Sequence, residues 1–286
     1  MSTTISTYFE VTKPNIWYLL VFTAIVGVIV ASGSAIPIAT LILVVIAVTM
    51  GSAGANTLTG YFDRDIDKIM SRTKMRPIPS KRIYPASKAL FFGLALSILS
   101  VSLAYYLNPL TAGLMLFGLL DNVVVYSKIL KRRNPINIIL GGFSGGAPVL
   151  IGYAAVTNTL DLLALTMGAL VVIWIPSHIW SLALHSKEDY KRANVPMLPV
   201  VVSEKTSVLF IAFTSLLLVI FSLVPLIFRA FGGIYMGVVI VGGVVMIMLN
   251  IWLIWKPNSE RAWVVFKYSS PYLALIFLAM MIDALI

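Results

Sequence analysis

Long apolar runs joined by short polar connections dominate this sequence of 286 residues and restrict its possible folds more than any other feature. A helix needs roughly 20 apolar residues to cross a bilayer. Hydrophobic residues make up 59% of the chain and charged residues 11%, which excludes an ordinary soluble core. The pattern therefore predicts an all-α polytopic membrane protein with nine transmembrane helices. The predicted helices are 14–34, 38–62, 86–106, 108–127, 136–156, 160–183, 206–228, 232–255 and 264–285.

The connections between these segments are too short for a separate soluble domain, so residues 1–286 are expected to form a single domain. Cysteine is absent, which excludes disulfides, thiolate catalysis and Cys-ligated metals. Residues 1–15 contain Lys13 as their one cation and no small-residue cleavage site. We therefore expect no cleaved signal peptide, and the first helix is predicted to be retained.

Positive charge is concentrated on one side of the predicted membrane. The formal net charge of +10 would by itself be compatible with nucleic acid as a partner. However, Lys and Arg residues lie before the first predicted helix and after the second, fourth, sixth and eighth, and only Arg229 lies in the other connections. By the positive-inside rule, this distribution predicts a multi-pass cell-membrane protein with a cytoplasmic N-terminus and an extracytoplasmic C-terminus. It favours a lipid bilayer, and not nucleic acid, as the partner.

Residues 56–82, at the end of the second helix, contain three aspartates and seven cations. Asp63 and Asp67 are four residues apart, so they share one face of a helix. Such a pair at the wet end of a membrane helix can bind Mg²⁺, which proteins hold through one or two carboxylates together with substrate phosphates. Arg72 and Arg76 repeat this spacing and suit phosphate oxygens. The alternative is a solvated loop that only fixes topology, but the density of charge favours a site.

Other polar residues lie at the same predicted rim. An intramembrane carboxylate such as Asp121 is either functional or paired with a loop cation for structure, and the sequence leaves both readings open. Asn56 and Thr59 lie on or near the helix face that carries Asp63. The further candidates for phosphate binding are Tyr126, Ser127, Lys131 and Arg132.

The sixth helix contains His178 beside Pro176, with Trp174 and Trp180 on either side. A proline inside a spanning helix frees a backbone carbonyl and bends the helix. His178 is either a substrate-binding residue or a hydrogen-bonded core histidine, and these readings are equally supported. In the fifth helix, two overlapping Gly-x-x-x-Gly pairs within 141–148 predict close helix packing.

The connection after the sixth helix contains a second polar cluster. His185 and Asp189 are four residues apart, which repeats the spacing of the first acidic pair with one carboxylate fewer. Lys187 and Tyr190, in the same connection, are further candidates for binding the substrate.

These motifs resemble the membrane-embedded aromatic prenyltransferase superfamily, which includes the 4-hydroxybenzoate polyprenyltransferases, and within it the heme-type members. The resemblance covers nearly the whole chain. Segments 174–180 and 189–199 separate heme-type from quinone-type members. The motifs that support the resemblance lie at 11–14, 63–77, 130–133, 137–148, 151–157, 174–180 and 189–199.

The resemblance implies nine helices around a central, laterally open cavity capped by cytoplasmic loops. It also implies Mg²⁺-dependent transfer of farnesyl from farnesyl diphosphate to a vinyl group of protoheme IX (heme b), giving heme O. Asp63 and Asp67 fall on the first metal-binding motif of the family, and Asp189 falls on the last acid of the second. Tyr126, Ser127 and Lys131 fall on its diphosphate-binding stretch.

Two positions depart from the family pattern. Thr59 stands where the family has Asn, with Asn56 one turn earlier, which leaves open which group supports the metal. His185 stands where an acid is expected, which leaves a second Mg²⁺ open. His178 takes a place where quinone-type members look to have an aspartate.

Two other functions compete with heme farnesylation. One is prenyl transfer to a quinone or lipid precursor by a sister enzyme. The other is transport, because transporters are also polytopic bundles with interrupted helices near the midplane. Most charged residues of this chain are predicted at one rim and not at the midplane, which favours an enzyme.

Overall fold

The computed structural model describes residues 4–286, and this part of the chain contains nine helical spans long and apolar enough to cross a membrane. The prediction of an all-α polytopic membrane protein is therefore confirmed. Three of the spans are built from two consecutive helical segments each. The spans are α2 (Pro14–Ser32), α3 (Ile38–Phe62), α5 (Ser87–Leu107), α6 with η1 (Pro109–Leu120, Asp121–Leu130), α7 with α8 (Asn137–Leu140, Phe143–Thr157), α9 (Leu162–His185), α12 with α13 (Glu204–Phe221, Val224–Ile227), α14 (Gly233–Trp255) and α15 (Ser259–Leu285).

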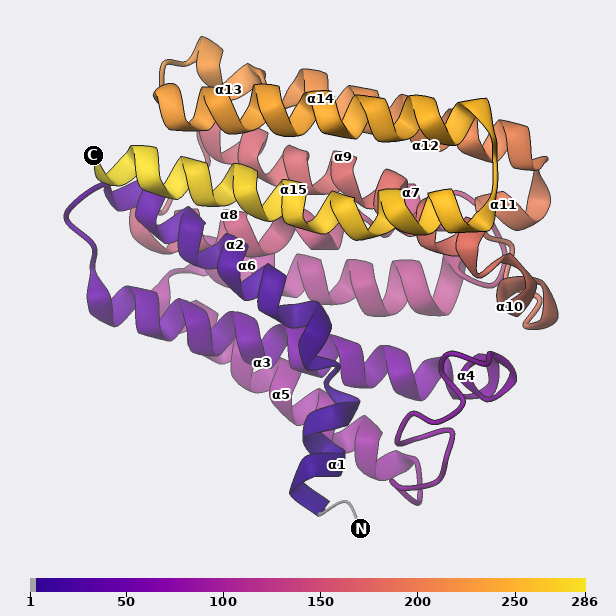
Figure 1. The fold of residues 1–286 in the computed structure, drawn as a ribbon. Coiled ribbons are helices and arrows are strands. Elements are labelled where there is room, and N and C mark those ends of the chain that lie inside the picture. Colours follow the sequence, from indigo (N-terminus) through magenta and orange to yellow (C-terminus); the bar gives the residue numbers. More distant parts are fainter. Residues whose placement is uncertain (1–3) are drawn as a thin grey trace.

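The spans lie side by side in one bundle, with α2, α3 and α5 on one side and α12, α14 and α15 on the other (Figure 1). α3 packs against α5, α2 against α8, and α15 against both α9 and α14. The short helix α1 (Thr4–Val11) precedes α2 and projects from the bundle. These contacts place α8 and α9 in the middle of the molecule.

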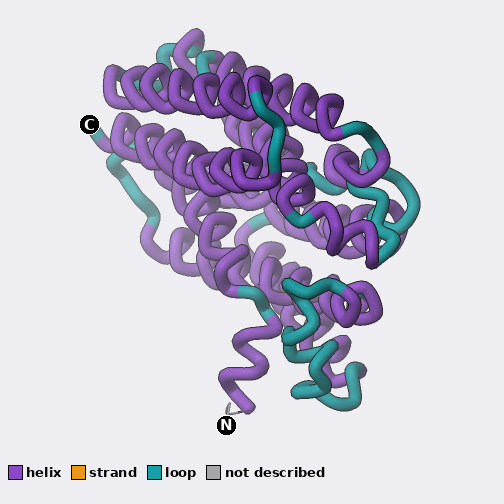
Figure 2. The backbone as a smooth tube through the Cα atoms, turned by 45° about the vertical axis from the view of Figure 1, so that its right-hand side comes forward, coloured by secondary structure: helices purple, strands orange, loops and turns teal. Residues whose placement is uncertain are grey.

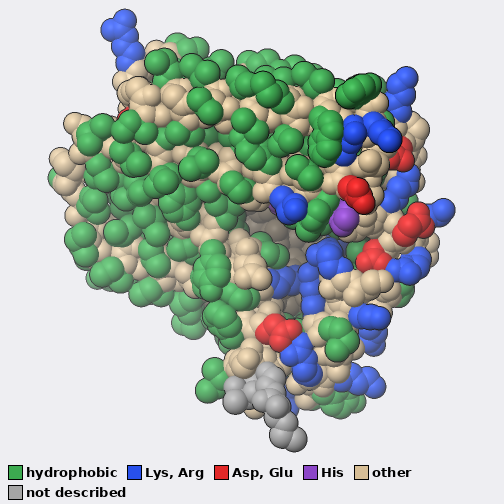
Figure 3. Space-filling view, viewed as in Figure 1, with side chains coloured by type: hydrophobic (Ala, Val, Ile, Leu, Met, Phe, Trp, Pro, Cys, Tyr) green, Lys and Arg blue, Asp and Glu red, His purple; other side chains and the backbone are tan. Residues whose placement is uncertain are grey.

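The two longest connections lie at the same end of the bundle (Figure 2). The connection from α3 to α5 contains α4 (Arg64–Ile69), and the connection from α9 to α12 contains α10 (Lys187–Arg192) and α11 (Leu198–Val201). Basic and acidic side chains gather at this end, whereas the rest of the visible surface is mostly apolar (Figure 3). The fold therefore brings together the two charged connections that the sequence singles out.

Glycines allow the central helices to touch backbone to backbone. A Cβ atom at Gly152 of α8 would lie 2.0 Å from the carbonyl oxygen of Ala24 in α2, and one at Gly27 would lie 2.3 Å from that of Val149. A Cβ atom at Gly146 would lie 2.7 Å from the carbonyl oxygen of Gly168 in α9. The packing role predicted for 141–148 is thus confirmed for α8, and larger side chains here would force the helices apart.

Asp121 closes an irregular junction between two spans. α6 continues into the π-helix η1, and the next span is interrupted at Gly141 and Gly142 before α8 begins. The Asp121 Oδ2 atom accepts a hydrogen bond of 2.7 Å from the backbone N–H of Ser144. A helix start leaves such N–H groups without intrahelical partners, so Asp121 satisfies one of them. This contact gives Asp121 a structural role, but its partner is a backbone N–H and not the loop cation that the sequence suggested; no salt bridge of Asp121 is present in residues 4–286.

Replacing Asp121 with Ala is expected to lower stability by about 1 kcal/mol, the usual effect of removing a helix cap. Turnover per folded molecule should be unchanged. Thermal unfolding and turnover of the detergent-solubilised variant would measure both quantities. A loss of turnover without a change in thermal stability would instead give Asp121 a functional role.

Candidate functional site

Asp63 and Asp67 are buried where the membrane span meets the charged rim, with 4% and 2% of their surfaces exposed. α3 ends one residue before Asp63, and the backbone N–H of Asp67 donates to the Asp63 carbonyl oxygen at 2.8 Å, which continues the helical pattern across the junction. The two carboxylates are therefore one turn apart, as their spacing predicts. Asp65, between them, has a side chain that is 62% exposed.

Cations from other elements pair with both buried carboxylates. Asp63 accepts hydrogen bonds from Ser127 Oγ at 3.1 Å and from Lys131 Nζ at 2.5 Å. Both oxygens of Asp67 lie 3.1 Å from Arg76 Nη1. Burial lowers the pKa of Lys131, but the neighbouring Tyr126 and Asp63 outweigh it and raise that pKa, so Lys131 remains charged. Ser127 thus lies in the π-helix η1 and Lys131 in the turn that follows it, and both side chains contact Asp63 of the acidic pair.

The second charged connection meets the first through Asp189. Its carboxylate accepts a hydrogen bond from the backbone N–H of Arg72 at 3.3 Å and forms an ion pair with Arg192. Arg192 also donates to Ser71 Oγ at 2.7 Å. Burial raises the pKa of Asp189, but hydrogen bonds from the Ser71 region and Arg192 outweigh it and hold that pKa below its usual range. Asp189 is therefore held against the turn at Ser71 and Arg72, which follows the acidic pair in the sequence, but it lines a different cavity from Asp67.

A cavity of about 510 Å³ opens beside Asp67. Its lining includes Asp67, Arg72 and Arg76 from the first charged connection, and Lys13 and Pro14 from the start of α2. In Figure 3, the molecular surface is hollowed where basic side chains meet the apolar body of the bundle. Asp67 therefore adjoins a partly open cavity, and both carboxylates of the pair are buried instead of pointing into open solvent.

Lys13 lines this cavity, although its position in the sequence predicted only membrane topology and a part in the family resemblance. Its backbone is left-handed, with φ 55° and ψ 62°, a conformation that costs a non-glycine residue free energy. Its Nζ donates to Thr59 Oγ1 at 3.3 Å, and that hydroxyl donates in turn to the Asn56 carbonyl oxygen at 3.0 Å. Burial, reinforced by the nearby Arg76, lowers the pKa of Lys13 to about 7.

Two of the three cations in the cavity lining lack a carboxylate partner. Arg76 is paired with Asp67, whereas no salt bridge within residues 4–286 involves the side chain of Lys13 or Arg72. The Lys13 ammonium group is half-buried and donates to a neutral hydroxyl, and Asp67 and Asp63 act on it only from beyond salt-bridge distance. Its charge is therefore incompletely compensated unless an anion is supplied. The cavity is therefore electrostatically prepared for an anionic ligand. The Thr12-Lys13-Pro14 motif was the available sequence signal for Lys13.

The remaining predicted residues have different surroundings. Arg132 pairs with the exposed Asp65 and donates to the Phe62 carbonyl oxygen, so it fastens η1 to α4 at the surface. Tyr190 is buried among apolar residues of the rim, and Tyr126 packs against the same group. The Lys131 Nζ atom lies 5.7 Å from the centre of the Tyr126 ring, within cation–π range.

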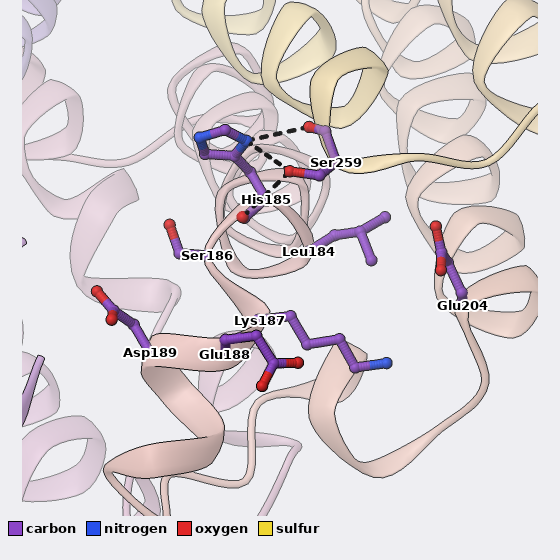
Figure 4. Close-up of a pocket in the computed structure, with 8 residues that line it drawn as sticks. All are labelled: Leu184, His185, Ser186, Lys187, Glu188, Asp189, Glu204 and Ser259. Carbon is purple, nitrogen blue, oxygen red and sulfur yellow. Dashed lines mark hydrogen bonds between the residues drawn. The ribbon is translucent and has the colours of Figure 1, made fainter. Parts of the chain in front are cut away.

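Lys187 lines a second cavity, of about 470 Å³, which is shown in Figure 4. His185, Asp189 and Glu204 also line it. His185 Nδ1 lies 3.1 Å from the carbonyl oxygen of Ser259, so this nitrogen carries the proton. Lys187 does not line the cavity beside Asp67.

A ladder of five stacked rings connects the interior to this rim. The rings, from α9 and α15, lie in the order Trp174, His178, Phe266, Trp263 and His185, with successive centres 4.3, 4.3, 4.8 and 4.6 Å apart. The angles between neighbouring rings are between 17° and 26°. We refer to these five residues as the aromatic ladder. Both histidines of the chain belong to it.

The acidic pair has the donor chemistry of a magnesium site. Within residues 4–286, no group of three His, Cys, Asp or Glu side chains gathers to bind a metal. Two carboxylates one turn apart nonetheless fit Mg²⁺, because this ion keeps several waters and takes further ligands from substrate phosphates. They do not fit a closed structural zinc site, which takes four protein ligands.

A polytopic bundle with buried carboxylates beside an anion-receptive cavity has the features of a membrane enzyme that acts on a phosphorylated lipid. The chain belongs to the UbiA prenyltransferase family, whose model matches residues 20–279. A relative from Cenarchaeum symbiosum, named protoheme IX farnesyltransferase 2, is 46% identical over 98% of this chain and 96% of its own length.

Solved structures show the same fold. A digeranylgeranylglyceryl phosphate synthase structure has a TM-score of 0.82 and 25% identity, covering 98% of both chains. A UbiA homolog from Archaeoglobus fulgidus bound to DMAPP and Mg²⁺ has a TM-score of 0.71 and 16% identity, covering 96% of this chain and 99% of its own. The second likeness concerns the fold alone.

Proposed function

We propose that this protein transfers a farnesyl group from farnesyl diphosphate to a vinyl group of protoheme IX, giving heme O and diphosphate. The observation that carries the proposal is the cavity beside Asp67, in which Lys13 and Arg72 lack carboxylate partners next to a buried acidic pair. The heme-type motifs and the name of the Cenarchaeum symbiosum relative support protoheme as the acceptor.

The cations of the rim are proposed to stabilise the leaving diphosphate. When the bond between farnesyl C1 and oxygen breaks, the electron pair stays on the diphosphate, and its charge must be neutralised. Lys13, Arg72 and Arg76 face the cavity, and Lys131 lies beside Asp63. Preorganised cations at such a position stabilise the developing charge more than water does.

Asp63 and Asp67 are proposed to hold Mg²⁺ together with diphosphate oxygens, and Asp189 is proposed to contribute from the second connection. A UbiA homolog from Archaeoglobus fulgidus that is bound to DMAPP and Mg²⁺ supports the choice of metal, and the choice of these residues rests on their burial and spacing. When bound, the ion would supply further positive charge to the diphosphate. Ser127 orients Asp63 by donating to it, and Tyr126 places its ring beside Lys131.

The carbon skeleton reacts below the rim, where the surroundings are apolar. The vinyl π electrons of protoheme form a new carbon–carbon bond to farnesyl C1, which leaves a cation on the vinyl carbon next to the pyrrole. Water adds to this carbon and loses a proton, which gives the hydroxyethylfarnesyl side chain. The aromatic ladder is proposed to offer π surfaces to the allyl cation, and exclusion of water at this depth would prevent its early capture.

The protein is proposed to act as a single transmembrane domain spanning residues 1–286, with the lipid bilayer supplying both apolar substrates. The N-terminus is proposed to be cytoplasmic and the C-terminus extracytoplasmic, since the two charged connections gather at one end of the bundle. This orientation places the cavity at the cytoplasmic rim.

The direct assay incubates the purified protein with farnesyl diphosphate and heme, with and without Mg²⁺. We expect diphosphate release only when heme and Mg²⁺ are both present. Release with a quinone precursor and not with heme would indicate a sister prenyltransferase. No release under any condition would contradict the enzyme assignment and favour transport.

The affinity for farnesyl diphosphate is expected to fall as the pH rises above about 7. Burial, with Arg76, lowers the pKa of Lys13 to about 7, so the free protein loses this positive charge as the pH rises through that value. Binding of the anion requires the proton, so affinity should fall by up to about tenfold per pH unit. Measurements of kcat/KM against pH would test this. In Lys13→Met, kcat/KM should not show this decrease with rising pH.

A further inference from the structure

His178 is held in a manner that leaves one ring nitrogen unused. Its Nδ1 atom lies 2.7 Å from Ser269 Oγ, and the Ser269 hydroxyl donates to the Phe266 carbonyl oxygen at 2.8 Å. Because the single hydroxyl proton of Ser269 points to that carbonyl, the Ser269 oxygen accepts a hydrogen bond from Nδ1–H. The ring proton is therefore on Nδ1, and the lone pair is on Nε2.

The Nε2 atom has no hydrogen-bond partner within residues 4–286, and it is not among their fully enclosed unpaired atoms. The His178 side chain is partly exposed, although it lies well inside the α9 span. Its ring faces are fixed by Trp174 on one side and Phe266 on the other. A polar group at this depth is usually functional. His178 therefore exposes one basic nitrogen, Nε2, and the two stacked rings fix the direction in which it points.

This arrangement is the one that prepares a histidine to bind a metal. A metal-binding imidazole commonly donates its other N–H to an oxygen, which sets the tautomer and the ring orientation. Ser269 supplies that oxygen here. The proposed acceptor is itself a metal complex, with an iron atom at the centre of a flat apolar ring.

The depth of His178 suits a porphyrin whose propionates reach the charged rim. His178 lies seven residues before His185, the last residue of α9, which corresponds to about 10 Å along the helix. Lys267 of α15 is exposed, and its Nζ lies 5.9 Å from the centre of the Trp263 ring, between the two histidines along the aromatic ladder. Cations are thus available toward the rim, and the unused nitrogen lies deeper, where the iron would be.

We propose that His178 Nε2 is an axial ligand of the iron of the heme acceptor and that Ser269 positions it. The identity of the ligand rests on the proposed function. Ligation would fix the porphyrin plane relative to α9 and so present a vinyl edge to farnesyl C1. His178 is then a substrate-binding residue, and Ser269 is a positioning residue.

Heme titration of the purified protein without farnesyl diphosphate tests this proposal independently of turnover. We expect the visible and electron paramagnetic resonance spectra of an imidazole-ligated heme. His178→Ala should lose these spectra and bind heme about 100-fold more weakly, and Ser269→Ala should bind it about tenfold more weakly. Metal-free protoporphyrin IX should bind the wild type and both variants alike, which also shows that the variants are folded.

His185→Ala is the matched control, because His185 is also stacked and also carries its proton on Nδ1. It should keep the heme spectra of the wild type. Added imidazole should restore the ligated spectrum to His178→Ala. An unchanged spectrum in His178→Ala, or a loss confined to His185→Ala, would overturn the proposal. Either result would leave the proposed function intact if the wild type still farnesylates heme. Failure of the proposed iron ligation can therefore be distinguished from failure of the proposed function.

Discussion

Replacing Asp63 with Asn is expected to lower kcat by roughly 1,000-fold while the protein remains folded. The amide oxygen can take the place of Oδ2 and accept from Lys131, and the amide N–H can donate to the Ser127 hydroxyl in place of Oδ1. The negative charge that would hold Mg²⁺ is lost, and removing one electrostatic group at a reaction centre costs roughly 100- to 1,000-fold. Steady-state turnover of heme with farnesyl diphosphate measures the effect.

Asp65→Asn provides the matched control. Asp65 lies two residues away and forms an ion pair with Arg132, but its side chain is 62% exposed. Exposed ion pairs contribute little to stability, so this variant should retain turnover. If Asp63→Asn and Asp65→Asn had equal turnover, Asp63 would have no place in the metal site.

Replacing Lys13 with Met is expected to lower kcat/KM for farnesyl diphosphate by roughly 100-fold. The methionine keeps much of the apolar volume of the lysine and removes a charge that has no carboxylate partner in residues 4–286. Because the folded protein without substrate gains little from this charge, thermal stability should not fall. Competition by inorganic diphosphate, measured in parallel, should weaken by a similar factor.

Lys81→Met is the control for Lys13→Met. Lys81 shares the left-handed backbone, with φ 62°, but its side chain is exposed. It should behave as the wild type in both measurements. Equal losses in the two variants would point to a general effect of net charge and would remove Lys13 from the diphosphate site.

The helices could be predicted from the sequence because a membrane leaves few alternatives. A backbone in hydrocarbon must satisfy its own hydrogen bonds, so each apolar run of sufficient length forms a helix. The residues at which the helices begin and end were less predictable. The last helix was predicted to begin at residue 264, but α15 begins at Ser259, so it contains an additional polar turn at its start. A helical turn made of polar residues at the end of an apolar run does not raise the hydropathy, so the sequence pattern does not reveal it.

The acidic pair could be predicted because it depends on local spacing, whereas its surroundings depend on distant contacts. Thr59, the partner of Lys13, is 46 residues away, and Arg72 and Asp189 meet across 117 residues. Neither contact leaves a periodic signal in the sequence. Arg132 was predicted to bind phosphate, and the sequence could not indicate that Asp65 would hold it at the surface.

The role of Asp121 also depended on an unpredicted feature. The break at Gly141 and Gly142 exposes the Ser144 N–H that Asp121 satisfies. The glycines were predicted to allow close packing, and they also interrupt the span. A glycine pattern alone does not distinguish these two effects.

Mass spectrometry of the porphyrin after incubation with farnesyl diphosphate and Mg²⁺ decides whether heme is the farnesyl acceptor. We expect one new porphyrin, heavier than protoheme by one farnesyl group and one hydroxyl group, formed together with diphosphate. This product should be missing with Asp63→Asn and present with Asp65→Asn. Recovery of unchanged protoheme from an active, diphosphate-releasing wild-type preparation would show that heme is not the acceptor.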